Sequence, residues 1–371
     1  MEHREGKAIL DVPGHNAAKP VGAPGARAKG EPFYNPGMAL NRDLSVLLVE
    51  AFARQRGREI DVADALAGTG ARSVRLALEV EAPILVHAND AQPQAVAAAR
   101  TSAKRNVVED RMTVTEGDAH AFLAARRFDV VDLDPCGSPM PFLDAAIRAT
   151  RDGGLVCATA TDTGALAGKF PRACRRRYDA HHGLHREAWR AEVGLRILAG
   201  AVVRAAGRFE RAATPVLCVA KGHWMRVVCR IEDGKKAADA AWRKLAFAWA
   251  EDGLGRVGLS VPPERTEWAG PLWTGPLHEA SFIPGMQKAA TGKPLAQKET
   301  LPLLDLLAGE ADAAPFWVVP DLLQRRLGPP PRRDELIERL RKAGLDAARS
   351  HIDPQGVRTS ADLPALRRAW A

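Results

Sequence analysis

Residues 60–70 read IDVADALAGTG, a short run rich in apolar residues that ends in a turn with two glycines. Apolar runs of this length are typical of strands in a buried sheet, and glycine lets the backbone turn tightly before a following helix. The same alternation of strand and helix continues, with further strands expected at residues 84–87, 112–115, 128–133 and 154–159. This alternation predicts a parallel, doubly wound α/β sheet.

The segments on either side extend the predicted sheet domain. Apolar residues at helical spacing predict a helix over residues 40–56. Two β-rich runs, residues 214–220 and 224–231, are separated by Lys221-Gly222-His223 and predict a hairpin. A doubly wound sheet that ends in a hairpin is the Rossmann-like element order of class I methyltransferases. The element order alone leaves other doubly wound proteins open.

The chain changes character after Ile231. A helix is expected over residues 235–250 and is followed by a stretch rich in proline and glycine. Short helices are expected over residues 297–308, 320–327 and 332–343. We therefore predict a flexible leader, an α/β domain and a smaller α+β, mostly helical C-terminal domain, at residues 1–30, 31–232 and 233–371.

The composition of the 371-residue chain excludes several classes of protein. It has 53 Lys and Arg against 45 Asp and Glu, a net charge of +8 that permits a polyanionic partner. No apolar run approaches the roughly 20 residues of a membrane span, and the N-terminus has no secretory signal. Five cysteines without a CxxC pair predict neither a disulfide framework nor a structural zinc site. We expect a cytoplasmic protein without membrane contact.

The glycine turn lies where α/β folds bind ligands, at the carboxyl edge of the sheet. A dinucleotide site would have a third glycine three residues after Gly70, where this chain has Ser73. An S-adenosylmethionine site needs only the turn and an acid at the next strand end, and Asp90 is such an acid. Asp118 follows the third strand, where adenine would lie in a methyltransferase. The turn alone leaves open a methyltransferase, a dinucleotide-binding protein and a purely structural turn whose acids cap helices.

The end of the fourth strand is more specific. Residues 128–139 read FDVVDLDPCGSP and place Asp134 directly before a proline. An exocyclic amine is a poor nucleophile, because its lone pair is delocalised into the ring. An acceptor that takes a hydrogen bond and finally the proton from the amine makes the nitrogen a better nucleophile. Asp134 would be that acceptor and the Pro135 carbonyl a second one, and a plain Asp-Pro turn that ends a strand is the structural alternative.

Several blocks of this sequence resemble the tRNA guanine-26 N2-dimethyltransferase family. They follow the family's order from residue 33 to residue 359. The main blocks are FYNP at 33–36, NRDLS at 41–45, DALAGTGAR at 64–72, ND at 89–90, DLDP at 132–135, TATDT at 159–163, RACRRRY at 172–178, GPLW at 270–273 and SHIDPQGVRT at 350–359. The resemblance implies transfer of one or two methyl groups from S-adenosyl-L-methionine to the N2 of guanine 26 in tRNA. It also implies a C-terminal domain that docks the tRNA.

The resemblance also implies roles for individual residues. Asp134 would be the catalytic acid/base, and Phe33 would stack on the target base next to Pro135 and Cys136. The cofactor would be bound by Arg42, Asp64, Gly68, Gly70, Arg72, Asp90, Asp118 and Ala119.

This chain departs from the family at two places. The family usually has an aromatic residue where this chain has Cys136, and many archaeal members carry a cysteine-rich zinc ribbon that residues 251–268 lack. We therefore expect no metal. Two alternatives stay open: an amine methyltransferase for another RNA or a protein, and a catalytically silent RNA-binding scaffold.

A basic segment supports an RNA partner. Seven Lys and Arg lie within residues 169–190 against two acids, and three histidines and one tyrosine lie among them. A solvated helix face is the default interpretation of such a run. Next to an amine-methylating motif it predicts phosphate contacts to tRNA, made by Arg172, Arg175, Arg176 and Arg177.

Overall fold

The computed structural model describes residues 1–12, 32–184, 187–251, 254–264, 266–310, 317–318, 323 and 327–370. The chain forms two compact units, neither of which is continuous in sequence. Unit 1 contains Met1–Thr161, Val228–Asp233 and Ser281–Leu304, and unit 2 contains Asp162–Val227, Gly234–Ala280 and Asp305–Ala371. The boundary near residue 232 stays a prediction.

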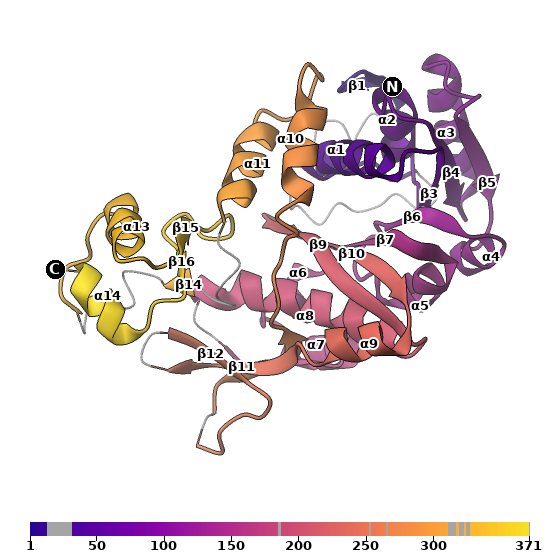
Figure 1. Ribbon diagram of the computed structural model, residues 1–371. Helices are drawn as coiled ribbons and strands as arrows, with labels where there is room; N and C mark the ends of the chain where they lie inside the picture. The colour runs from indigo at the N-terminus through magenta and orange to yellow at the C-terminus, as the bar shows by residue number, and fades with distance from the viewer. Residues whose placement is uncertain are drawn as a thin grey trace. The chain divides into compact units, whose positions relative to one another are not determined.

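A doubly wound sheet forms the centre of the fold, as predicted (Figure 1). Its strand order is β5-β4-β3-β6-β7-β10-β9. The strands are β3 (Ile60–Asp64), β4 (Ile84–Asp90), β5 (Met112–Glu116), β6 (Phe128–Leu133), β7 (Thr150–Ala160), β9 (Arg211–Lys221) and β10 (Trp224–Asp233). The strands from β5 to β7 pair in parallel. Strands β9 and β10 are the two β-rich runs for which the sequence predicts a hairpin.

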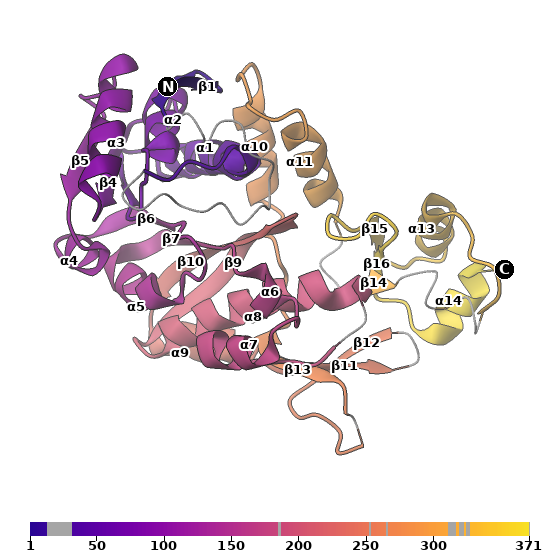
Figure 2. The same ribbon diagram turned by 180° about the vertical axis from the view of Figure 1, so that it is seen from behind.

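Helices α1 (Ala39–Arg56), α2 (Ala71–Glu79), α3 (Pro93–Arg105), α4 (Ala119–Ala124) and α5 (Met140–Ala149) alternate with the strands. The inner strands are largely buried, for example over all of β6, because helices cover both faces of such a sheet, whereas the edge strand β5 is mostly exposed. Helix α10 (Phe282–Ala290) belongs to unit 1 although it comes from far along the chain. It lies beside α1 in both views (Figures 1 and 2). A Cβ on Gly285 would lie 3.3 Å from Ala51, so the two helices approach closely.

The N-terminal segment corrects one expectation. Residues placed in the flexible leader form a hairpin of β1 (Glu2–Glu5) and β2 (Ala8–Asp11), with Gly6 at a φ of +58° in the turn. The backbone N–H of Ile9 donates to Asn106 Oδ1 at 2.9 Å, and the neighbouring Leu10 is buried. These interactions with the end of α3 are long-range, so the local sequence does not reveal them. Residues 13–31, which include the rest of the predicted leader, lie outside the described part of the chain.

Unit 2 contains a long helix that the sequence did not predict, α8 (Glu187–Gly207), and the short helices α6 (Thr163–Leu166) and α7 (Pro171–Tyr178). A four-stranded sheet has the order β12-β11-β13-β8. Its strands are β8 (His181–His182), β11 (Leu245–Glu251), β12 (Leu254–Gly258) and β13 (Trp268–Trp273). The helix expected over residues 235–250 is wrong in its second half, because α9 (Lys235–Trp242) ends before β11. Burial alternates along the first residues of β11, the period of a strand.

The C-terminal part combines short strands with helices. A three-stranded sheet has the order β14-β16-β15, from Trp317–Val318, Val357–Thr359 and Ala347–Arg349. The predicted helices appear as α11 (Thr300–Gly309) and α13 (Arg333–Lys342), followed by α14 (Leu363–Trp370). The helix predicted over residues 320–327 falls mostly outside the described residues. Within the part of the chain that the structure describes, no helix has the length and apolarity needed to cross a membrane.

Candidate active site

The glycine turn after β3 is a close backbone crossing. Gly68 and Gly70 have φ angles of +56° and +75°, in the left-handed region that favours glycine. A Cβ on Gly68 would lie 2.9 Å from the carbonyl oxygen of Phe33, and one on Gly70 would lie 2.8 Å from the Cβ of Ala99. Any other side chain at these two positions would clash with Phe33 or Ala99, so the turn requires glycine. The backbone of Phe33 thus lies beside this turn, and the predicted stacking of its ring on the target base stays a prediction.

Asp90 is fixed at the end of β4. One of its carboxylate oxygens accepts a hydrogen bond from the backbone N–H of Gly68 at 2.8 Å. The other accepts from the backbone N–H of Gln92 at 2.9 Å. Each oxygen keeps a lone pair, so the carboxylate has the acceptors that two neighbouring hydroxyl groups would need.

Asp118 also follows a strand, β5, but already has a structural role. It caps α4, accepting hydrogen bonds from the backbone N–H groups of His120 and Ala121 at 2.9 and 3.0 Å. The bonds from Ala121 and His120 lower the pKa of the exposed Asp118 carboxyl. Ala119, the first residue of the helix, is buried.

Arg72 connects α2 to Asp134. Its guanidinium forms an ion pair with Asp134 and lies 3.6 Å from Asp132 Oδ2. The same group donates to Asn41 Oδ1 at 2.9 Å and to the Ser45 hydroxyl, both on α1. The structure therefore brings Arg72, predicted as a cofactor contact, to the predicted catalytic carboxylate. The sequence does not single out Asn41 or Ser45 by themselves, because only the fold places them on Arg72.

A second buried acid lies close to this pair. Asp64 and Asp132 are in register on β3 and β6. Burial raises the pKa of Asp64 to about 6, Asp132 and Asp134 also raise it, and Arg72 opposes them. The Ser73 hydroxyl donates to Asp64 Oδ2 at 2.6 Å. Three carboxyl groups thus share one guanidinium, which leaves this edge of the sheet with a negative potential.

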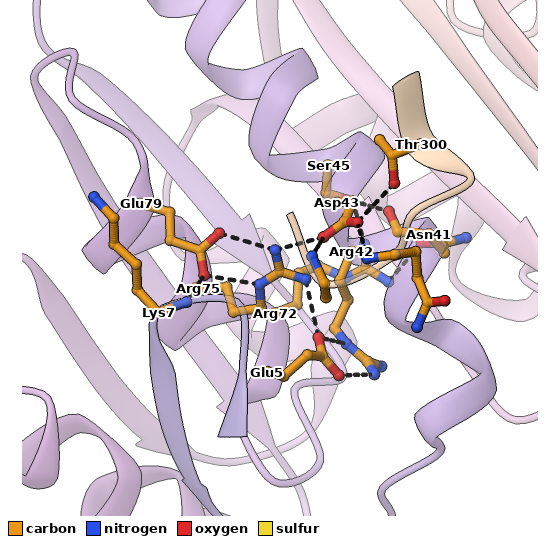
Figure 3. A network of polar contacts seen from close by, with 12 residues as sticks. Glu5, Lys7, Asn41, Arg42, Asp43, Ser45, Arg72, Arg75, Glu79 and Thr300 are labelled. Atoms are coloured by element: carbon orange, nitrogen blue, oxygen red, sulfur yellow. Dashed lines mark hydrogen bonds and ion pairs between the residues drawn. The ribbon is translucent and has the colours of Figure 1, made fainter. Parts of the chain in front are cut away.

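Arg42 belongs to a buried network of charges (Figure 3). Its guanidinium donates to both oxygens of Glu5, at 2.7 and 2.5 Å, and to the carbonyl of Asn35 at 3.0 Å. Glu5 also accepts from Arg75 at 3.0 Å and from the Tyr34 hydroxyl at 2.8 Å. The N-terminal hairpin therefore holds Arg42 against the segment that carries Phe33. The structure ties this predicted cofactor contact to Glu5, a residue that no local sequence signal identifies.

Asp43 extends the network to a distant part of unit 1. Its carboxylate accepts from Arg75 at 2.6 Å and from the backbone N–H groups of Ala296 and Gln297 at 3.0 and 2.9 Å. The Thr300 hydroxyl adds a fourth hydrogen bond at 2.7 Å (Figure 3). The first turns of α1 are therefore held from both sides, which fixes the helix that carries Asn41 and Ser45.

The loop after Asp134 is pinned to the end of β7. The backbone N–H of Gly137 donates to Thr161 Oγ1 at 2.8 Å, and its carbonyl accepts from the Thr161 N–H at 2.9 Å. Cys136 is exposed on this loop, and Phe33 is 40% exposed. Pro135 and Cys136 thus follow Asp134 on a fixed loop. Their predicted contact with a substrate base stays a prediction.

The predicted phosphate contacts lie on α7, in unit 2. Arg172, Arg175 and Arg176 are exposed. Arg177 is also exposed, and it forms an ion pair with Asp162 at 2.9 Å. The structure thus places the four arginines on one short helix.

Unit 2 also contains a buried group of His278, Glu310 and His351 whose ligand atoms lie within 4.8 Å of one another. Both imidazoles contact Glu310 Oε2, at 2.9 and 2.7 Å. The other oxygen accepts from Arg358 at 2.6 Å and from the His351 backbone. These contacts already occupy Glu310, so we assign the group to the packing of unit 2.

The sheet, the glycine turn and the Asp-Pro strand end together define a class I methyltransferase. The family model of N2,N2-dimethylguanosine tRNA methyltransferase matches residues 6–370, and the chain belongs to this family. The predicted family, fold class and enzyme class are confirmed.

Individual relatives agree with this family. The chain is 38% identical over 347 residues to the tRNA (guanine(26)-N(2))-dimethyltransferase of Thermococcus kodakarensis, covering 89% of this chain and 90% of that one. It is 34% identical over 361 residues to the enzyme of the same name from Methanothermobacter thermautotrophicus, covering 93% of each. The solved structure of Trm1 from Pyrococcus horikoshii with S-adenosyl-L-methionine is similar with a TM-score of 0.85 and 32% identity, over 100% of this chain and 99% of that one.

Proposed function

We propose that this protein transfers one or two methyl groups from S-adenosyl-L-methionine to the N2 of guanine 26 in tRNA. The observation that carries the chemistry is the Asp134 carboxylate, held by Arg72 at the end of β6. Membership of the dimethylguanosine family supports the substrate and the position. A tRNA substrate in turn supports a cytoplasmic location.

The residues at the carboxyl edge fit the cofactor. Bound there, S-adenosyl-L-methionine supplies an electrophilic methyl group on a positively charged sulfonium. The three carboxyl groups around one guanidinium suit that charge, and Asp90 would accept hydrogen bonds from the ribose hydroxyls. The turn at Gly68 and Gly70 leaves room for the ligand to approach the backbone, and Asp118 and Ala119 would lie at the adenine.

Asp134 moves the proton of the reaction. Its carboxylate accepts a hydrogen bond from the guanine amine and directs the nitrogen lone pair to the methyl group. As the new N–C bond forms and the methyl–sulfur bond breaks, the amine proton passes to Asp134. The side chain is 17% exposed, so the proton can leave to water before a second transfer. No covalent bond between protein and substrate is needed.

Arg72 and Arg42 are positioning residues in this proposal. Arg72 orients Asp134 through their ion pair, while its hydrogen bonds to Asn41 and Ser45 hold the guanidinium itself. Arg42 fixes the segment from Phe33 to Asn35 through its bond to the Asn35 carbonyl. Phe33 would then stack on the guanine after it leaves its place in the tRNA fold.

The tRNA itself would be held by charge. Arg172, Arg175, Arg176 and Arg177 would contact phosphates, and residues 233–371 would contribute further contacts. Such contacts position a nucleic acid without reading its sequence.

A methylation assay tests the proposed function directly. The full chain is incubated with methyl-labelled cofactor and bulk tRNA, and the digested nucleosides are identified. Label in N2-methylguanosine or N2,N2-dimethylguanosine, mapped to position 26, is the expected result. Label in another RNA or in protein would instead establish a different amine substrate, and no label at all would indicate a silent scaffold.

A further inference from the structure

Helix α7 borders an open groove in unit 2 with a volume of about 640 Å³. Its lining includes Asp162, Gly164, Phe170, Arg172 and Arg176. The volume is in the range of sites that bind small organic molecules. All lining residues belong to unit 2, so the groove exists within that unit alone.

The groove is positively charged. Lys169, Arg172 and Arg176 line it, are exposed, and have no ion-pair partner among the described residues. The one acid of the lining, Asp162, is already engaged by Arg177 at 2.9 Å and by the Tyr178 hydroxyl at 2.5 Å. Three cations without counter-ions favour an anionic ligand.

An exposed aromatic ring lies among these cations. Phe170 is 55% exposed, although a phenyl ring is normally buried. A Cβ on Gly164 would lie 2.9 Å from the ring, so the glycine makes room for it. The Phe170 N–H donates to the Gly164 carbonyl at 3.1 Å, and the Phe170 carbonyl accepts from Ala173 and Cys174 at 3.0 Å. The backbone of Phe170 is therefore fixed, and its exposed ring carries the Lys169 ammonium 5.6 Å from the ring centroid.

An exposed aromatic ring beside cations that have no acid partner among the described residues matches the chemistry of a nucleotide. Base rings stack on aromatic side chains, and phosphates pair with guanidinium groups. We propose that the groove binds one unpaired nucleotide of the tRNA in addition to the target guanine, with its base on Phe170 and its phosphate at Arg172 and Arg176. The proposal rests on tRNA being the substrate. The nucleotide must be unpaired, because a base in a duplex offers no free face.

Short probes test the base and the phosphate separately. Binding of the full chain to the single-stranded hexamers r(A)6 and r(U)6, and to inorganic polyphosphate, is measured by fluorescence competition. Phe170→Ala is expected to weaken r(A)6 binding by about 5- to 150-fold, the range for one lost base–aromatic stack. Polyphosphate binding should not change, and r(U)6 should be affected less than r(A)6. Phe170→Tyr keeps the ring and should bind like the wild type.

Two arginines provide a matched pair. Arg176 lines the groove, whereas Arg175, which is also exposed, does not. Arg176→Ala should weaken both hexamer and polyphosphate binding more than Arg175→Ala does. Thermal melting of each variant verifies that α7 is intact.

Three outcomes would overturn the site. They are a wild-type chain that does not bind r(A)6, a Phe170→Ala variant that binds r(A)6 normally, and a Phe170→Ala variant that loses r(A)6 and polyphosphate binding equally. None of them affects methylation of guanine 26 by the wild-type chain, which is measured independently. A failed methylation assay with intact hexamer binding would contradict the proposed function instead.

Discussion

Asp134 is the proton acceptor of the proposed reaction. Its carboxylate forms an ion pair with Arg72. Asp134→Asn keeps the shape of the side chain but removes the proton acceptor. We expect cofactor and tRNA binding to stay near normal while single-turnover methylation falls by about 10²-fold or more. A near-normal rate in this variant would mean that another group activates the amine.

Asp90 should give the opposite result. Its carboxylate is held by backbone N–H groups and takes no part in the amine chemistry of our proposal. Asp90→Ala is expected to weaken cofactor binding by ~1–3 kcal/mol, the scale of a lost hydrogen bond to a charged group. Isothermal titration calorimetry with the cofactor measures this, and unchanged affinity would reject the role.

A substitution of Arg72 distinguishes two hypotheses, that this residue contacts the cofactor or that it positions Asp134. Arg72→Met removes the interactions with Asp134, Asn41 and Ser45 while keeping an unbranched side chain. If Arg72 positions Asp134, kcat falls and the KM for the cofactor changes little, because the carboxylate is no longer held at the reacting amine. A cofactor contact would instead raise KM at unchanged kcat. Arg100→Met, an exposed position on α3, is the control.

At this scale the sequence identifies the acids better than their partners. Asp64, Asp90 and Asp134 can be predicted because each lies at a strand end, and parallel strands bring their carboxyl ends to one edge. The resemblance identifies Arg42, Arg72 and Asp134 but not Glu5, which holds Arg42. Glu5 and Arg42 are 37 residues apart, and no local periodicity connects them.

The N-terminal hairpin stabilises the fold through Glu5. Burial raises the pKa of Glu5, but attraction and hydrogen bonds from Arg42, attraction from Arg75 and the Tyr34 hydrogen bond outweigh it and lower the pKa to about 2. A lowered carboxyl pKa adds stability that is fully present above the unfolded value of about 4.5 and is lost as pH falls toward 2. The shift corresponds to about 3 kcal/mol.

Glu5→Gln should therefore destabilise the protein near neutral pH by about that amount. The difference from wild type should shrink as pH falls from about 4.5 toward 2, where Glu5 takes up its proton. Urea unfolding at several pH values measures the effect. Glu2→Gln is the control, because Glu2 is exposed and 3.7 Å from Arg105, and a surface pair contributes little. Equal effects of both substitutions would rule out the buried network as the cause.

Helices and strands whose apolar residues repeat with a clear period can be predicted from the sequence. Those defined by tertiary contacts cannot. Helix α1 is expected over residues 40–56 and runs over Ala39–Arg56. The helix expected over residues 235–250 is wrong in part because Ala and Trp are compatible with both states, and pairing of Leu245 with Trp273 decides for a strand. Helix α8 is buried over most of its length, so it lacks the polar face that marks an amphipathic helix.

The net charge of the whole molecule favours binding to RNA. A net charge of +8 attracts any polyanion and does not identify the surface that binds. The ion pairs of individual arginines indicate which surface can bind RNA. Several arginines of unit 1 are bound to acids, such as Arg75 to Glu5, Asp43 and Glu79. The arginines of α7 are mostly without acid partners, since only Arg177 has one among the described residues. Phosphates that pair with such free cations release their counter-ions, whereas arginines already bound to acids are not available for this.

Salt dependence tests this distinction on the intact protein. Neutralising Arg175, Arg176 and Arg177 should lower affinity for all tRNAs alike and flatten the slope of log K against log[salt] by roughly one unit for each phosphate that is no longer bound. We expect a change of about two units rather than three, because Arg177 is paired with Asp162. Neutralising Arg100, Lys104 and Arg105, exposed on α3, removes the same total charge. Equal slopes in the two triple variants would mean that net charge alone governs binding and that α7 is only a solvated helix face.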